Sequence, residues 1–171
     1  MNFFKGKGAV VAVAILLAAG IGVGVVWHSS NSSPKTSTGG LMTAAGLPSV
    51  SANAGAAPVI GAPSGTAPVS LVSKDIIVGT GQTALSTSTV TAQYVLMSWK
   101  SGKVLQSSWP SGFTAPLTGV IPGWQQGLPG MKVGGRRLLV IPPALAYGPA
   151  GSGPIGPNET LIFVVDLLAV K

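Results

Sequence analysis

The stretch VIPGWQQGLPGMKVGGRRLLVIPPALAYG, residues 120–148, decides the fold of this chain. Its beginning predicts a helix of one or two turns, because Pro122 suits the first position of a helix. Residues 136–141 are an apolar run of strand length, and Pro142-Pro143 end it since neither proline can donate to a sheet ladder. Tyr147 then presents an aromatic hydroxyl beside a glycine.

The residues on either side of this stretch predict further strands. Residues 89–99 are rich in β-branched and aromatic side chains, and residues 160–169 form another apolar run. Residues 107–119 contain Pro110 and Pro116, so we expect an irregular loop there. Many strands and one short helix predict an α+β fold, mainly β, in which an antiparallel sheet packs against the helix.

Several motifs taken together resemble the FKBP-type peptidyl-prolyl cis-trans isomerases. The motifs V-I-x-G-W, G-M-K-V-G, R-R-L-x-V-I-P-P and A-Y-G follow one another within residues 120–148, and the flanks 76–81 and 160–168 agree. The resemblance covers roughly residues 69–171. It implies a twisted antiparallel sheet wrapping one short helix, with an apolar pocket between them. It also implies isomerisation of X–Pro bonds, proline-containing polypeptides as clients, macrolides as candidate ligands and no cofactor.

The same resemblance assigns the site residue by residue. The implied catalytic residues are Tyr147, Ile121, Trp124 and Phe163. The implied substrate-binding residues are Tyr94, Leu105, Gln106, Phe113, Val120 and Ile155. In this interpretation the Tyr147 hydroxyl and the Ile121 backbone N–H hold substrate carbonyls, while aromatic rings form apolar walls above Trp124. Taken singly, most of these residues would be ordinary core residues, and only their joint occurrence in family order favours a site.

Two features depart from the family pattern. The family usually has Phe-Asp where this chain has Leu105-Gln106, and the loop at residues 109–117 is short. These departures support an alternative function, a binding or chaperone module on the same fold with little or no turnover. A secreted macrolide-binding or envelope-docking protein is a third hypothesis, but no feature of the sequence supports it.

The inventory of side chains excludes several kinds of chemistry. The chain has no cysteine, one histidine and three acidic residues, which are too few for a metal centre or a catalytic triad. Its formal charge is +7, but the basic residues are dispersed. Arg136 and Arg137 are adjacent on the predicted strand and so point to opposite faces. We therefore expect neither a metal nor a nucleic-acid partner.

The N-terminal part of the chain predicts a membrane segment. Residues 1–7 carry Lys5 and Lys7, and residues 8–27 follow without a charge. Twenty helical residues span about 30 Å, the thickness of the hydrocarbon core. The positive-inside rule leaves residues 1–7 in the cytoplasm and the remainder outside it. We expect a single-pass anchor, and the alternative is a signal peptide whose cleavage releases a secreted protein.

Residues 28–68 separate this segment from the domain at residues 69–171. They consist mainly of Ser, Thr, Gly, Ala and Pro, with Lys35 as the one charge and with five prolines. No period of 2 or 3.6 residues is sustained across them, so they offer little apolar surface to offset the entropy of ordering. We predict a flexible linker over residues 28–68.

Overall fold

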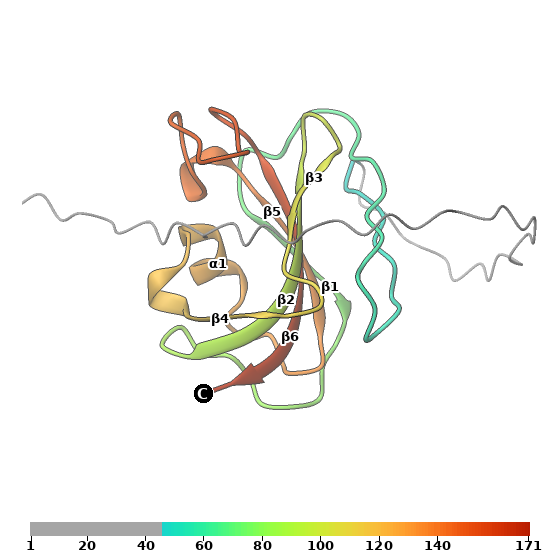
Figure 1. Ribbon diagram of the computed structural model, residues 1–171, viewed down its shortest axis with the longest axis vertical. Helices are drawn as coiled ribbons and strands as arrows, with labels where there is room; N and C mark the ends of the chain where they lie inside the picture. The colour runs from blue at the N-terminus through green and yellow to red at the C-terminus, as the bar shows by residue number, and fades with distance from the viewer. Residues whose placement is uncertain (1–45) are drawn as a thin grey trace, which may run out of the picture.

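The computed structural model describes residues 46–171, which form a six-stranded sheet with one α-helix against it (Figure 1). The elements in chain order are β1 Val72–Ile77, β2 Thr89–Ser98, β3 Val104–Ser107, β4 Phe113–Pro116, the 3-10 turn η1 Leu117–Gly119, α1 Pro122–Gly127, β5 Arg136–Ile141, the 3-10 turn η2 Pro143–Leu145 and β6 Leu161–Val170. The strand order is β1-β5-β6-β2-β3, β4 pairs with β2, and every pairing is antiparallel. The predicted fold class is confirmed.

Strand β4 corrects the irregular loop predicted over residues 107–119. Residues 113–116 pair with residues 89–92 of β2, and the hydroxyls of Thr91 and Thr114 are hydrogen-bonded across the pair at 2.9 Å. Pro116 occupies the last position of the strand, where its missing N–H breaks no continuing ladder. Pairing with β2 therefore overrides the local breaker residues.

The two central strands, β5 and β6, are apolar on both faces. In β5, Leu139 and Ile141 belong to the core on the helix side, whereas Leu138 and Val140 belong to a second core on the opposite side. This alternation follows the two-residue period of a strand. A strand buried on both faces appears in the sequence as a continuous apolar run, and both faces must be covered.

Residues 46–68, here called the strap, cover the face opposite α1 (Figure 1). Val50 and Ile60 form an antiparallel bridge, and the N–H of Gly61 donates to the Ser49 carbonyl at 2.8 Å. Val50 is only 3% exposed and packs in the second core, against which Leu47 and Ile60 also pack. The strap is a short hairpin-like element seated on the sheet.

Arg136 ties the strap to the two central strands. Its side chain is fully buried and makes two bonds with the Asp166 carboxylate, from Nε to Oδ1 and from Nη2 to Oδ2, each 2.6 Å long. Nη1 also donates to the Ser51 carbonyl at 2.8 Å, and Nη2 donates to the Ala56 carbonyl at 2.7 Å. Arg137 points the other way, toward Asp75 and the Gly127 carbonyl of α1, as the strand period predicts.

The predicted linker over residues 28–68 is therefore wrong for residues 46–68. Those residues are ordered because the sheet offers them an apolar face and the Arg136 guanidinium offers donors for their carbonyls. The predicted segments 1–7 and 8–27 and the first part of the linker lie outside the described residues. No helix within residues 46–171 is long and apolar enough to cross a membrane.

Val50 tests the contribution of the strap to stability. We expect Val50→Asp to lower the free energy of unfolding by about 2–3 kcal/mol, because it removes a buried apolar side chain and buries a charge. Val59→Asp is the matched control on the same hairpin, since Val59 is 73% exposed, and it should change stability by less than about 0.5 kcal/mol. Urea unfolding of the full chain measures both. Equal stability of the two variants would contradict a packed strap.

Candidate functional site

The position of α1 on the sheet is set by two glycines. Gly123 and Gly127 are buried, and a Cβ added to Gly123 would lie 2.4 Å from Ile141 Cγ2. A Cβ at Gly127 would lie 2.7 Å from Leu139 Cδ2. Their hydrogen-only side chains allow the helix backbone to contact β5 directly. Because the helix cannot move outward without losing this contact, Trp124 is held at a fixed depth above the sheet.

Trp124 lies at the centre of four rings, here called the aromatic cluster, which come from four different elements. The members are Tyr94 of β2, Phe113 of β4, Trp124 of α1 and Phe163 of β6. The Trp124 ring centroid lies 5.6 Å from that of Tyr94, 6.0 Å from that of Phe113 and 5.5 Å from that of Phe163. These three contacts are edge-to-face, the arrangement that aromatic quadrupoles favour.

Half-buried apolar residues surround the cluster and give it an accessible surface. Leu105, Val120, Ile121 and Tyr147 pack on the same core but remain partly exposed, as does Phe113. Tyr94, Trp124 and Phe163 are almost fully buried beneath them. Nine of the ten residues implied by the resemblance thus share the core on the helix side, and the tenth, Gln106, is polar and lies on β3 next to it.

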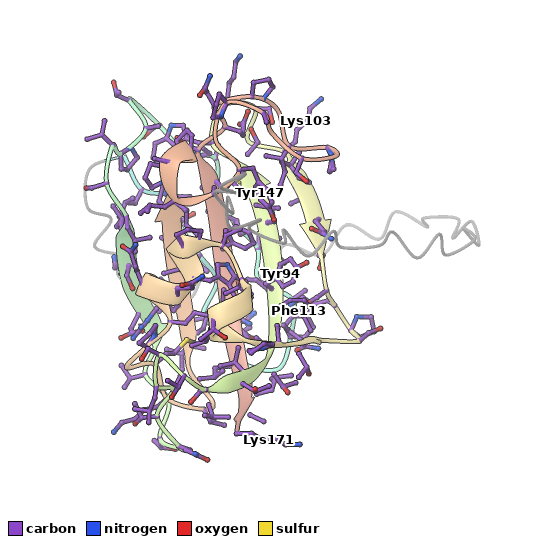
Figure 2. The ribbon with its side chains drawn as sticks, turned by 90° about the vertical axis from the view of Figure 1, so that its left-hand side faces the viewer. Tyr94, Lys103, Phe113, Tyr147 and Lys171 are labelled. Carbon is purple, nitrogen blue, oxygen red and sulfur yellow. The ribbon has the colours of Figure 1, made fainter. Side chains whose placement is uncertain are left out.

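Tyr147 lies within a tight turn that begins at Pro142 and Pro143. The N–H of Leu145 donates to the Pro142 carbonyl at 3.0 Å, and the N–H of Gly148 donates to the Pro143 carbonyl at 2.9 Å. Gly148 has φ +61°, a conformation that favours glycine directly after the tyrosine. Figure 2, which looks at the helix side, shows Tyr147, Tyr94 and Phe113 following one another along the molecule.

Ile155 reaches the same core from the long loop before β6. The N–H and C=O of Ile155 exchange hydrogen bonds with those of Ser152, both at 2.9 Å, and Ile155 is 7% exposed. The Asn158 N–H donates to the Gly148 carbonyl at 2.9 Å and closes the loop at its base. Just before β6, Glu159 accepts a hydrogen bond from the Ser98 hydroxyl of β2.

The polar groups of this core are uncharged, and each of them can donate a hydrogen bond. Burial raises the pKa of Tyr94 to about 12, and the neighbouring Tyr147 adds to the shift. Burial also raises the pKa of Tyr147. Both phenols therefore keep their protons at neutral pH. Within residues 46–171 neither hydroxyl has a hydrogen-bond partner, and the buried Trp124 Nε1 has none either.

Sequence reasoning missed Gln125, one turn into α1. Its Nε2 donates to the Val120 carbonyl at 2.7 Å. The Ile121 carbonyl accepts from the N–H groups of Trp124 and Gln125 at 2.9 and 3.2 Å. The Ile121 N–H lies between these two held carbonyls and has no acceptor among the described residues. No sequence motif could have revealed a bond from a side chain to the carbonyl five residues earlier.

Gln106 lies on β3 opposite Leu96, a residue of the same core. It is half-buried, and its side chain makes no hydrogen bond within the described residues. The three carboxylates of the chain are all engaged elsewhere: Asp75 with Arg137, Asp166 with Arg136 and Glu159 with Ser98. No carboxylate therefore belongs to the aromatic cluster.

Comparison with known proteins decides the family. The sequence profile of the FKBP-type peptidyl-prolyl cis-trans isomerases matches residues 81–168, just over half of the 171 residues. The chain belongs to this family. It is a peptidyl-prolyl cis-trans isomerase, as the resemblance implied. The family in general binds proline-containing substrates and macrolides.

Several relatives of this FKBP domain show how far the similarity extends. The probable FK506-binding protein of Corynebacterium glutamicum is 50% identical over 114 residues, which cover 66% of this chain and 97% of that protein. The crystal structure of FkpA from Escherichia coli is 43% identical with a TM-score of 0.56, over 59% of this chain and 48% of that one. The isomerase of Pseudomonas syringae pv. tomato has a TM-score of 0.55 at 32% identity, over 59% of this chain and 75% of that one. The chain spans about half the length of the FkpA chain.

The raised pKa of Tyr94 predicts how the stability of the FKBP domain depends on pH. The unfolded chain loses this phenolic proton near pH 10, before the folded chain does near pH 12. Stability that is fully present below pH 10 is therefore lost as the pH rises toward 12. We expect the free energy of unfolding to fall by about 1 kcal/mol between pH 9 and pH 11 on account of Tyr94.

Tyr94→Phe removes this titration, so its free energy of unfolding should fall less steeply over the same range. Denaturant unfolding of both proteins at several pH values measures the two slopes. Identical slopes would show that the hydroxyl is not buried as described.

Proposed function

We propose that this FKBP accelerates isomerisation of X–Pro bonds in extracytoplasmic polypeptides and assists their folding, by binding the twisted amide non-covalently against the aromatic cluster. The observation that carries the proposal is the polarity of the site. Its available polar groups, the hydroxyls of Tyr94 and Tyr147 and the N–H of Ile121, can all donate, and no carboxylate stands among them.

A site of this kind suits the amide before proline. The X–Pro amide is tertiary, so it offers carbonyl acceptors and no N–H of its own. An ordinary secondary amide would also bring an N–H that must find an acceptor in the site, and a buried donor that finds none costs about 1–3 kcal/mol. The proline ring adds apolar surface that the rings can cover.

The same site favours the twisted amide over the planar one. Planarity comes from resonance in the C–N bond, and rotation about it meets a barrier of about 18–20 kcal/mol. The twisted form has lost this resonance, its carbonyl is less polar and it is less strongly hydrated. An apolar surface therefore binds it better than it binds the planar form. Each factor of ten in rate needs only ~1.4 kcal/mol of such preference.

The proposed roles follow from the placement of the residues. Trp124 supplies the floor, and Phe163, Tyr94 and Phe113 supply the walls. The Tyr147 hydroxyl and the Ile121 N–H hold client carbonyls on either side of the rotating bond. The remaining apolar contacts with the client come from the half-buried residues Leu105 and Val120 and from Ile155. No proton is transferred, so the mechanism needs no acid or base.

Tyr147→Phe tests the role of the hydroxyl. We expect the slow, proline-limited refolding phase of a small protein to be accelerated about three- to tenfold less by this variant than by the wild-type full chain, since one hydrogen bond is lost. Leu85→Ser is the control, because Leu85 is 62% exposed, and it should accelerate refolding as the wild type does.

A different result would support the binding or chaperone module suggested by Leu105 and Gln106. In that case the wild type would leave the slow phase unchanged and yet suppress aggregation of the refolding protein. Such an outcome would overturn the proposed catalysis at this site.

Action outside the cytoplasm is supported by the sequence before the described residues. Residues 1–7 are basic and residues 8–27 carry no charge, which is the pattern of an N-terminal membrane anchor with its following domain outside. We propose a single-pass protein of the cell membrane. Release by cleavage of a signal peptide is the alternative, and either route places the isomerase among newly exported polypeptides.

Protease protection tests this location. In a bacterial host that makes the full chain with a C-terminal tag, protease added to spheroplasts should degrade the tagged domain. A variant that starts at residue 46 lacks the apolar segment and should be protected. Retention of the intact full chain in the membrane fraction would support the anchor, and a shortened soluble product would support cleavage. Protection of the full chain would contradict export.

A further inference from the structure

We propose that Gln125 is a positioning residue, which holds the Val120–Ile121 peptide so that its N–H faces the client carbonyl. The inference rests on the proposed function, because it concerns the donor that the Ile121 backbone supplies. It assigns a task to a side chain that lies outside the aromatic cluster and touches no client atom.

The first step is the planarity of the peptide. The Val120 C=O and the Ile121 N–H belong to one trans peptide unit, so they point in opposite directions within one plane. Gln125 Nε2 donates to the Val120 oxygen at 2.7 Å. Whatever holds this carbonyl therefore also sets the direction of the Ile121 N–H.

The second step is the neighbouring peptide. The Ile121 carbonyl accepts from the N–H groups of Trp124 and Gln125 at 2.9 and 3.2 Å, which closes the first turn of α1. Ile121 itself has φ −59° and ψ 148°. With both carbonyls held, rotation of the peptide unit between them would break a hydrogen bond.

The third step is that the held N–H has no acceptor of its own. No described residue accepts from the Ile121 N–H, and its side chain is half-buried on the core that carries Trp124 and Tyr147. A donor fixed in direction and left unpaired is prepared for an external acceptor. Fixing a group before the reaction avoids the entropic cost of orienting it at the transition state.

Gln126 provides a matched control within the same helix. Both glutamines are exposed and consecutive, but the Gln126 side chain makes no hydrogen bond among the described residues. The chemistry of the amide provides a second control. In Gln125→Glu the side chain keeps its shape, but its carboxylate accepts only and repels the Val120 oxygen at neutral pH. Once protonated, near pH 4.3 for an unperturbed glutamate, it can donate again.

The experiment measures kcat/KM for an Ala-Leu-Pro-Phe peptide by NMR exchange, with full-length protein at pH 7 and pH 4.5. We expect Gln125→Ala to lower kcat/KM about three- to tenfold at both pH values. Gln125→Glu should be at least as slow at pH 7 and should recover toward the wild type at pH 4.5. Gln126→Ala and Gln126→Glu should stay within about twofold of the wild type throughout, and all four variants should unfold at similar denaturant concentrations.

A second measurement follows the site without turnover. On addition of the peptide the Ile121 amide proton should shift downfield in the wild type, and this shift should be lost in Gln125→Glu at pH 7. Unchanged activity of Gln125→Ala, or a Gln125→Glu variant with no pH-dependent recovery, would overturn the positioning role while the isomerase remained. A wild type that neither isomerises the peptide nor shows the Ile121 shift would overturn the proposed function and the inference together.

Discussion

The direct contact between α1 and β5 is the constraint on which the site depends. Gly123 and Gly127 meet Ile141 and Leu139 so closely that any side chain on the glycines would push the helix away from the sheet. The depth of this contact sets how far Trp124 reaches among the rings of β2, β4 and β6. It also sets where the Ile121 peptide, the entry to the helix, meets the edge of the cluster. A helix of six residues could not hold such a position by its own hydrogen bonds.

The helix contact requires a rigid sheet, and the strap contributes to that rigidity from the other side. The strands β5 and β6 bury apolar side chains on both faces, so the face opposite α1 must be covered as well. Arg136 of β5 and Asp166 of β6 form a buried ion pair on the face that the strap covers. Desolvation of such a pair is costly, and it is offset only when the remaining donors are satisfied. The carbonyls of Ser51 and Ala56 supply those partners, so the ion pair selects one seating of the strap.

Local sequence predicted the elements that are decided locally. The bounds of β5 could be predicted because an apolar run ends at Pro142. The start of α1 could be predicted because Pro122 suits a first helical position. The structure of the strap and of β4 could not be predicted from their local sequence, because each depends on a partner distant in sequence. The strap depends on Arg136, and β4 depends on β2. For the site, joint motifs placed nine residues in one core. They could not reveal that the Gln106 side chain makes no hydrogen bond among the described residues, or that Gln125 binds a carbonyl, because side-chain direction depends on the assembled fold.

The low number of acidic residues leaves the site without a carboxylate. All three carboxylates are bound to partners away from the rings, and the one site position where the family has an acid carries an amide, Gln106. The phenols of Tyr94 and Tyr147 are therefore left as neutral donors without internal acceptors, and burial keeps them protonated. The buried Trp124 Nε1 also has no partner among the described residues, and a buried donor left unpaired costs stability in the free protein. In the proposed mechanism these donors are paired when a client carbonyl arrives, so binding favours a ligand rich in carbonyl oxygens. The amide that precedes proline offers such a carbonyl and brings no N–H that would itself need an acceptor.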